Sequence, residues 1–141
     1  MPAYVSEALR ARIAAADRQR CAYCLTSEAI TGLPLTIDHI HPTALGGETE
    51  FANLCLACRS CNEFKASRSS GIDPLTGNET PLFQARRERW SDHFAWTSDG
   101  SRIEGLTPIG RATVVALRMN NAVVVAARTR WVLVGWHPPT D

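Results

Sequence analysis

The sequence predicts an α+β fold, in which a strand–loop–strand–helix core follows an N-terminal helix and precedes further C-terminal helices. β-prone runs lie at residues 36–40 and 53–56, and a helix-forming run follows at residues 58–68. Two Cys-x-x-Cys pairs, beginning at Cys21 and Cys58, lie on either side of these strands. Pairs of this spacing indicate a bound metal ion that ties the core together.

The expected elements of the N-terminal half follow from capping and turn residues. Ser6 can cap a helix that begins with an acidic first turn and continues to about Arg18. Pro42 ends the first β-prone run, and Gly46-Gly47 marks a tight turn in the connection to the second run.

The C-terminal half is expected to finish the same domain. Turn formers concentrate in residues 69–81, which predicts an ordered turn or a linker. Residues 98–101 form a turn between two short strands, and Thr107-Pro108 starts a helix. A break at Asn120-Asn121 precedes a last helix from about residue 122 to 134. We therefore expect one domain over residues 1–141, with a core at 19–68 and a strand and helix extension at 82–141.

Composition limits the classes of function. With 141 residues and a net charge of +1, the chain fits one compact domain without a globally basic surface. No apolar run approaches the roughly 20 residues that span a bilayer, and residues 1–20 are not expected to act as a signal peptide, because charges are spread through them. A soluble, cytoplasmic protein is the expectation. The basic residues are almost all arginines, with Lys65 the single lysine; phosphate contact and a GC-rich coding sequence explain this bias equally well.

The cysteines predict a structural zinc site. Cys21 and Cys24 form one pair, Cys58 and Cys61 the other, and 33 residues separate the pairs. Four thiolates complete a closed tetrahedral shell, which leaves no position for a reacting water. An odd count without a secretory segment favours zinc over disulfides. Cys55 lies outside both pairs and is expected as a small buried hydrophobe.

A further set of residues occurs in a fixed order around the second pair. These residues are Asp38-His39-Ile40-His41-Pro42, Gly46-Gly47, Asn53-Leu54 and Asn62-x-x-Lys65. In this order, residues 21–65 resemble the HNH endonucleases of the zinc-bound ββα-metal kind, and the C-terminal part is similar to the ends of bacterial members. The resemblance implies a ββα-metal (HNH) core that hydrolyses DNA.

The chemistry of phosphodiester hydrolysis assigns expected roles to three of these residues. The resemblance places the general base at His39, whose side chain can take a proton from water near neutral pH. Asp38 and Asn62 offer a carboxylate and an amide oxygen to a divalent cation. Because an amide suits hard cations, we expect Mg²⁺ or Mn²⁺ there. Asn62 departs from the family name, which has a histidine at this position.

The remaining motif residues have supporting or open roles. The resemblance implies that Asn53 steadies the loop and the base. His41 can touch metal or phosphate, or simply cap the loop. Lys65 can contact phosphate, but with Arg68 it fits a solvated helix face at least as well.

The other conspicuous residues also have plain structural explanations. An exposed charged face explains three neighbouring arginines as well as a DNA path does; they are Arg86, Arg87 and Arg89. The four tryptophans are expected in the core, His93 as a packed or surface residue, and His137 as inert.

Three classes of function compete. The first is a DNA endonuclease acting on double-stranded DNA, with a homodimer and a partner protein as open alternatives for its assembly. The second is a non-catalytic zinc module that binds nucleic acid or protein, and the third is a thiol redox protein. Asp38-His39 together with Asn62 favours the endonuclease, because a binding module needs no acid–base pair beside an oxygen ligand.

Overall fold

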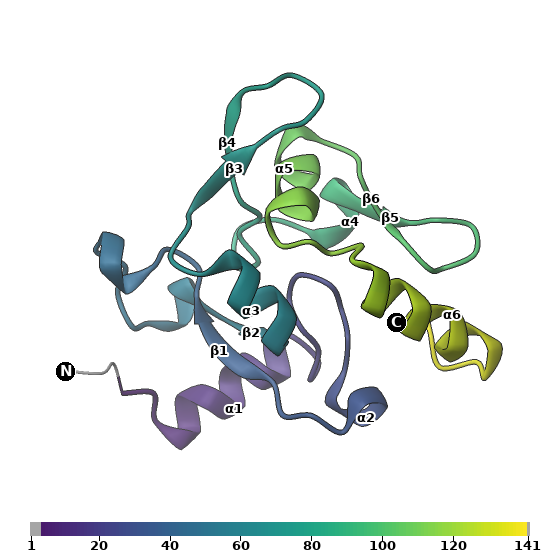
Figure 1. The fold of residues 1–141 in the computed structure, drawn as a ribbon. Helices are drawn as coiled ribbons and strands as arrows, with labels where there is room; N and C mark the ends of the chain where they lie inside the picture. The colour runs from purple at the N-terminus through teal and green to yellow at the C-terminus, as the bar shows by residue number, and fades with distance from the viewer. Residues whose placement is uncertain (1–3, 141) are drawn as a thin grey trace. The chain divides into compact units, whose positions relative to one another are not determined.

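The computed structural model of the chain describes residues 4–140, which fold into two compact units. Residues 4–69 and Gln84–Glu88 form the first unit (Figure 1). Ser70–Phe83 and residues 89–140 form the second. Within this part of the chain, no helix is long and apolar enough to cross a membrane.

The first unit begins with helix α1, Glu7–Ala16. The Ser6 side chain caps it by accepting a hydrogen bond from Leu9 N at 3.1 Å, as expected for an N-terminal serine. Helix α1 ends two residues before Arg18, because Arg18 and Gln19 take positive φ values. Helix α1 contacts strand β2, and Ile13 is its buried residue.

The centre of the first unit is the expected strand–loop–strand–helix arrangement. Strand β1, Thr36–His39, pairs antiparallel with β2, Leu54–Ala57, so that His39 lies opposite Leu54. All residues of β2 are buried. Helix α3, Arg59–Lys65, follows and contacts β1 (Figure 1). The predicted α+β core is therefore confirmed, with an additional short helix α2, Glu28–Thr31, before β1.

The loop between β1 and β2 contains two short 3₁₀ helices, Thr43–Leu45 and Phe51–Asn53. Gly46 has a φ of +94°, which a residue with a side chain adopts only at a cost. A Cβ atom on Gly47 would lie 1.7 Å from the backbone oxygen of His41. The Gly46-Gly47 pair thus permits the tight turn that the sequence predicts and the close approach of two backbone segments.

The segment Gln84–Glu88 completes the first unit through Arg86. Its Nη2 atom forms an ion pair with Asp17, and its Nε atom donates to Leu54 O at 2.8 Å. The guanidinium also lies over the Phe51 ring, 4.9 Å from its centroid. The expectation that Arg86 lies on an exposed face or a DNA path is wrong, because its side chain is almost fully covered and joins α1 to β2.

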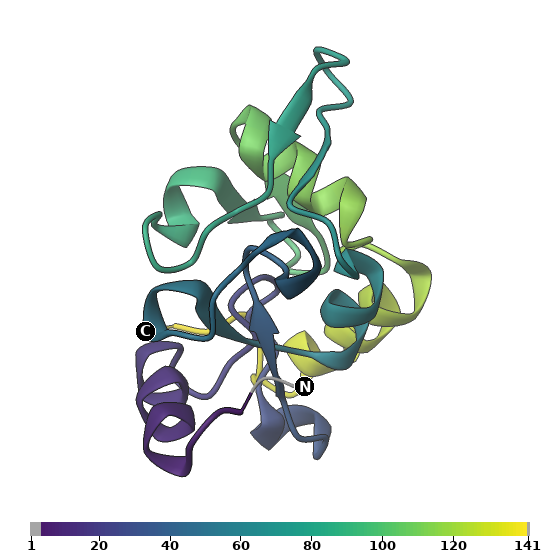
Figure 2. The ribbon, with the colours of Figure 1, turned by 90° about the vertical axis from the view of Figure 1, so that its left-hand side faces the viewer.

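The second unit consists of two hairpins and three helices. Strands β3, Ser70–Ile72, and β4, Glu79–Pro81, form the first hairpin; β5, Phe94–Trp96, and β6, Ile103–Gly105, form the second. The helices are α4, Trp90–His93, α5, Pro108–Ala116, and α6, Ala122–Leu133. Helix α5 runs beside the β3–β4 hairpin in Figures 1 and 2 and also contacts β6.

The helix boundaries of this unit agree with the capping residues in the sequence. Thr107 caps α5 with Pro108 at its first position, and the Asn121 side chain caps α6 by accepting from Val124 N. Residues 69–81 differ from the expected turn or linker because they contain the β3–β4 hairpin. A bidentate ion pair between Arg111 and Asp73 holds this hairpin to α5, at 2.8 and 2.9 Å.

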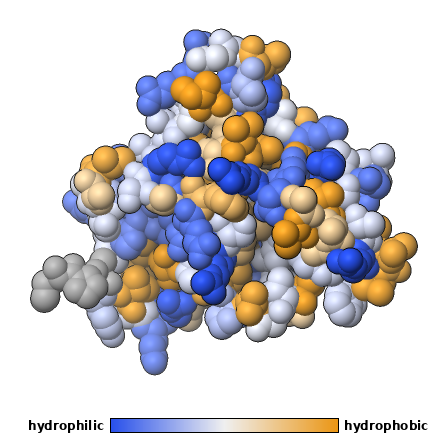
Figure 3. All heavy atoms as spheres, in the orientation of Figure 1, coloured by the Kyte–Doolittle hydropathy of each residue, from blue (hydrophilic) through white to orange (hydrophobic). Residues whose placement is uncertain are grey.

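The tryptophans of the second unit lie at the edge of the core rather than within it, because Trp90, Trp96 and Trp131 are half-buried. Trp96 and Trp131 both contact the ring of His137, which is buried and has Nε2 3.0 Å from Gly100 O. His137 is thus a packing residue. Trp136 is 58% exposed, so its predicted place in the core is wrong. Figure 3 shows apolar side chains on the surface of α6, where Val123 and Leu133 are more than 80% exposed.

Candidate functional site

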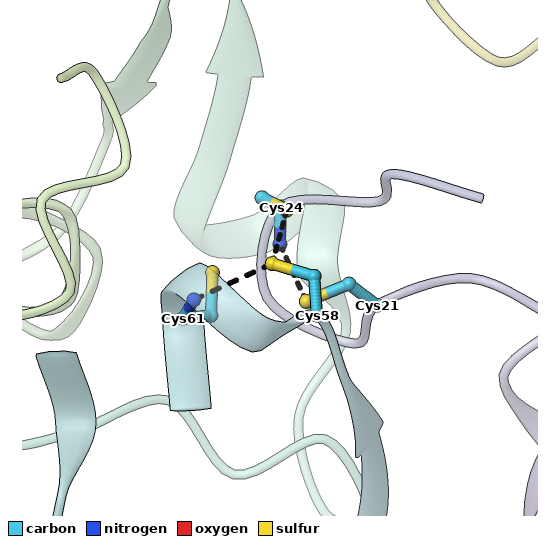
Figure 4. A group of neighbouring side chains, drawn as sticks. All are labelled: Cys21, Cys24, Cys58 and Cys61. Carbon is cyan, nitrogen blue, oxygen red and sulfur yellow. Dashed lines mark hydrogen bonds between the residues drawn. The ribbon is translucent and has the colours of Figure 1, made fainter. Parts of the chain in front are cut away.

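The four paired cysteines meet at one point in the first unit. Cys21 and Cys24 lie on the turn after α1, while Cys58 caps α3 and Cys61 lies in its first turn (Figure 4). Their sulfur atoms all lie within 4.8 Å of one another. In each pair, the second backbone N–H points at the first sulfur, at 3.5 Å for Cys24 to Cys21 and 3.4 Å for Cys61 to Cys58.

This geometry fits a structural zinc ion. Zinc–sulfur bonds of about 2.3 Å in a tetrahedron require sulfurs about 3.8 Å apart. The Sγ atoms of Cys24 and Cys58 are 3.6 Å apart. Among His, Cys, Asp and Glu of residues 4–140, these cysteines are the group that the structure brings within metal-binding range. The expected structural zinc site is supported by this clustering.

The electrostatics of the cluster also favour a cation. Burial raises the pKa of the Cys21 thiol, and contacts with the neighbouring thiols raise the pKa of Cys61. Hydrogen bonds from the other thiols, that of Cys21 first, lower the pKa of Cys24. Ionisation of the Cys24 thiol is therefore favoured, whereas ionisation of Cys21 and Cys61 is opposed. Several thiolates share such a volume only when a metal ion supplies the compensating charge.

His39 lies at the last position of β1, where its side chain is half-buried. Its Nε2 atom is 2.9 Å from Thr49 Oγ1, in the loop that follows. Its backbone oxygen accepts a hydrogen bond from Lys65 Nζ at 3.0 Å. Both the ring and the backbone of the predicted base are thus held by residues from other segments of the unit.

Asp38 points to the opposite face of β1 and is only 4% exposed. Tyr23 donates its hydroxyl to Asp38 Oδ2 at 2.8 Å, and Lys65 Nζ lies 3.3 Å from Oδ1. Burial raises the pKa of the Asp38 carboxyl, against the lowering effects of Lys65 and Tyr23. Tyr23 lies between Cys21 and Cys24. The contacts of Asp38 therefore connect the turn that carries these two cysteines, strand β1 and helix α3.

Lys65 is fully buried, which corrects the expectation of a solvated helix face. Its ammonium group satisfies the Asp38 carboxylate and the His39 carbonyl, so it does not reach toward solvent or phosphate in this structure. A lysine at the C-terminal end of a seven-residue helix looks exposed in the sequence. It is buried here because α3 packs on β1 through that side.

Asn62 lies one turn before Lys65 on the same helix. Its Nδ2 atom donates to Thr36 Oγ1 at 3.0 Å, a bond that does not use its carbonyl oxygen. Helix α3 therefore meets β1 through polar contacts of Asn62 with Thr36 and of Lys65 with both Asp38 and the His39 carbonyl. The two residues expected to bind a divalent cation lie along one helix–strand interface.

Asp38 and Asn62 offer a carboxylate and an amide oxygen, which are the kinds of ligand that a hard divalent cation prefers. The Lys65 ammonium already neutralises the Asp38 carboxylate at 3.2 Å. A divalent ion bound by Asp38 would therefore take the place of Lys65 in that contact.

Asn53 holds the loop that separates the strands. Its Oδ1 accepts from His41 N at 2.8 Å, and its Nδ2 donates to His41 O at 3.0 Å and to Glu48 O at 2.8 Å. These three bonds hold the loop, and the role implied for Asn53 in steadying the base stays a prediction. His41 is exposed, with Nε2 3.1 Å from Leu45 O, which favours the loop-capping alternative for this residue.

Sequence reasoning missed two residues at this site. Tyr23 occupies an unconstrained position of the first Cys-x-x-Cys pair, and Thr49 lies between the glycine pair and Asn53. A polar residue beside a metal ligand was the available signal for Tyr23. For Thr49, nothing in the sequence alone indicates that the loop folds back onto His39.

Comparison with known proteins gives one family match. Residues 21–68 match the family model described as HNH endonuclease. No curated protein and no solved structure matches the chain. The matched range begins at the first cysteine of the metal cluster and ends just after helix α3. The resemblance of residues 21–68 to the HNH family, predicted from the sequence, is confirmed by this match.

Proposed function

We propose that the protein is an endonuclease that hydrolyses phosphodiester bonds of double-stranded DNA, with a divalent cation and with His39 as the general base. The observation that carries the proposal is the placement of His39. Its ring and its backbone are both anchored, by Thr49 and Lys65, at the end of a strand in the matched segment. A histidine held in a defined orientation is suited to accepting a proton.

The reaction requires a proton acceptor and compensation for negative charge on the phosphate. In this proposal, a ring nitrogen of His39 takes the proton of the attacking water, and the P–O bond to the leaving oxygen breaks. Mg²⁺ or Mn²⁺, held by Asp38 and Asn62, would neutralise charge on the phosphate and on the leaving oxygen. Asn53 acts indirectly, because it fixes the loop that carries Thr49.

The cysteine cluster contributes positioning in this proposal. Cys61 immediately precedes Asn62, and Tyr23 lies inside the other cysteine pair and contacts Asp38. A zinc ion bound by all four cysteines would hold both segments in place. The active-site residues would then sit on a rigid frame despite the short helix that carries one of them.

A non-catalytic zinc module that binds nucleic acid or protein is the second candidate. The burial of Lys65 against Asp38 favours it, because the carboxylate is already neutralised without a divalent ion. The two candidates differ in whether His39 is needed for cleavage, so a cleavage assay separates them.

The test is the cleavage of supercoiled plasmid by zinc-loaded protein with Mg²⁺ or Mn²⁺. Wild type should nick or linearise the plasmid, and His39→Ala should lose at least a hundredfold in rate, in line with removal of a general base. Zinc content and thermal unfolding of His39→Ala should match wild type, because His39 is outside the cysteine cluster. Equal cleavage by both proteins, or none by wild type with either metal, would reject the proposal.

A further inference from the structure

We propose that Lys65 is an exchangeable internal cation of the Asp38 carboxylate. Its ammonium group compensates the charge of Asp38 before a divalent cation is bound, and it leaves that contact when one binds. This inference rests on the proposed function in one respect only, the choice of Asp38 as a ligand of the divalent cation. The exchange of Lys65 can be measured without any cleavage.

The Lys65 ammonium group lies among oxygen atoms. Its Nζ atom is 3.3 Å from Asp38 Oδ1, 3.2 Å from Asp38 Oδ2 and 3.0 Å from the His39 carbonyl oxygen. The Lys65 side chain is fully shielded from solvent, and that of Asp38 is 5% exposed. Carboxylate and carbonyl oxygens are also the ligands of hard divalent cations. Lys65 therefore places a single positive charge in surroundings that suit a divalent cation.

One carboxylate compensates poorly for both cations at once. Asp38 carries one negative charge, and its Oδ2 atom already accepts a hydrogen bond from Tyr23 at 2.8 Å. An ammonium group and a divalent cation beside this carboxylate would repel each other, and burial leaves little water to screen that repulsion. Binding of the divalent cation is therefore coupled to the departure of Lys65, while Tyr23 can keep the carboxylate in its orientation.

The type of residue at this position also favours exchange. Of the 15 basic residues in the chain, Lys65 is the single lysine. Other carboxylates pair with arginine, as in Arg86 with Asp17 and Arg111 with Asp73. A guanidinium holds a carboxylate with a rigid fork of donors, whereas a lysine carries a compact charge on a flexible four-carbon stem. The flexible cation thus lies at the carboxylate to which the proposed function gives a metal ion.

Departure of Lys65 would affect both parts of the proposed active site. The same ammonium group holds the backbone of His39, and Asn62 lies one turn before Lys65 on α3. Asn62 contacts Thr36 through its amide nitrogen, and that bond does not use its carbonyl oxygen. Exchange of Lys65 therefore couples occupancy of the metal site to the contacts that hold the base.

The first test follows Lys65 in full-length, zinc-loaded wild type. Because the chain has one lysine, ¹⁵N-lysine labelling gives one side-chain signal, and mass spectrometry of one peptide reports its acetylation. Mg²⁺ should shift the ammonium signal toward that of a solvated lysine. It should also raise the acetylation rate roughly tenfold or more, since a buried group reacts only through local opening. KCl at the same ionic strength is the control and should change neither quantity.

The second test measures Mn²⁺ affinity from the EPR signal of the free ion. Lys65→Met should bind Mn²⁺ more tightly than wild type by roughly 5- to 150-fold, the usual range for coupling between two ligands. Arg59→Met is the matched control, because it removes a positive charge from an exposed position of the same helix, and its affinity should match wild type. Asp38→Asn combined with Lys65→Met leaves neither charge buried and should bind much more weakly. Zinc content should be equal in all these proteins.

Two results would overturn the inference. One is that Mg²⁺, at concentrations that displace bound Mn²⁺, changes neither the signal nor the acetylation rate of Lys65 in wild type. This result stands even if Lys65→Met fails to fold. The other is a folded Lys65→Met protein that binds Mn²⁺ no more tightly than wild type.

Failure of the proposed function gives different results. Undiminished Mn²⁺ binding by the double variant, or no binding by wild type and Lys65→Met, would reject Asp38 as a ligand and the inference with it. Exchange of Lys65 in a protein that does not cleave plasmid would reject the proposed function alone.

Discussion

At the scale of single residues, the unit built around the HNH segment depends on buried polar contacts. Asp38 and Lys65 form an ion pair that is almost completely shielded from water, and Tyr23 supplies a further hydrogen bond. A buried charge is tolerated only while its partner is present. These residues therefore link the stability of the segment to the geometry around His39.

Lys65→Met should strongly destabilise the protein, because it leaves the Asp38 carboxylate buried without its cation. The expected loss in unfolding free energy is about 3–5 kcal/mol. Asp38→Asn combined with Lys65→Met should lose much less than the sum of the single variants. Urea unfolding of the zinc-loaded proteins measures this cycle, and additive losses would show that the two side chains act independently.

At the scale of elements, the cysteine cluster joins two segments that have little regular structure of their own. One is the turn after α1, and the other is the junction of β2 with the seven-residue helix α3. A helix of this length is not stable alone. Its position against β1 therefore depends on packing, on the contacts of Asn62 and Lys65, and on the sulfur cluster.

Cys58→Ser should lower zinc content and stability together, because it removes one thiolate of the cluster while the serine can still cap α3. Structural zinc contributes on the order of 10 kcal/mol in small domains, so unfolding should shift by tens of degrees or lose its cooperativity. Cys55→Ala is the matched control, since Cys55 is buried on β2 outside the cluster, and it should retain zinc. A fully stable, zinc-free Cys58→Ser protein would contradict the structural site.

At the scale of the whole molecule, the described residues form two compact units, and the second has its own ion pair, in which Asp73 is buried and Arg111 is half-buried. Hydrogen bonds from Arg111 hold the pKa of Asp73 well below its usual range. Hydrogen bonds from Ser101 and Thr97 lower the pKa of Asp99 to about 2. Both carboxylates favour the folded state when ionised. The single-domain organisation over residues 1–141 stays a prediction.

Asp73→Asn should destabilise the protein at neutral pH and progressively less in acid. A carboxylate with a lowered folded pKa contributes its full stability above the unfolded value, 3.8 for aspartate, and loses it as the pH falls further. The difference between wild type and variant should therefore be constant from pH 7 to about pH 5 and shrink below pH 4. Asp92→Asn, at an exposed position of α4, is the control. A difference that is unchanged at pH 3 would contradict this linkage.

The order of elements and the chemistry of the metal cluster were predictable from the sequence, because they depend on local signals. Ser6, Thr107 and Asn121 cap their helices where capping propensity places them. The spacing of the cysteines predicts the cluster, because two-residue spacing brings both sulfurs of a pair together. The HNH segment was predicted in the same way, from residues whose order along the chain is itself the signal.

The partners of buried polar side chains were decided only by the tertiary structure. Lys65 and Arg86 look like solvent-exposed cations in the sequence. In the structure, each is covered and pairs with one carboxylate, which lies 27 residues away for Lys65 and 69 residues away for Arg86. The contact of Thr49 with His39 likewise depends on how the loop folds back on β1. Local patterns determine which residues enter a helix, strand or cluster. Only packing determines which face is covered, and therefore which charge finds a partner.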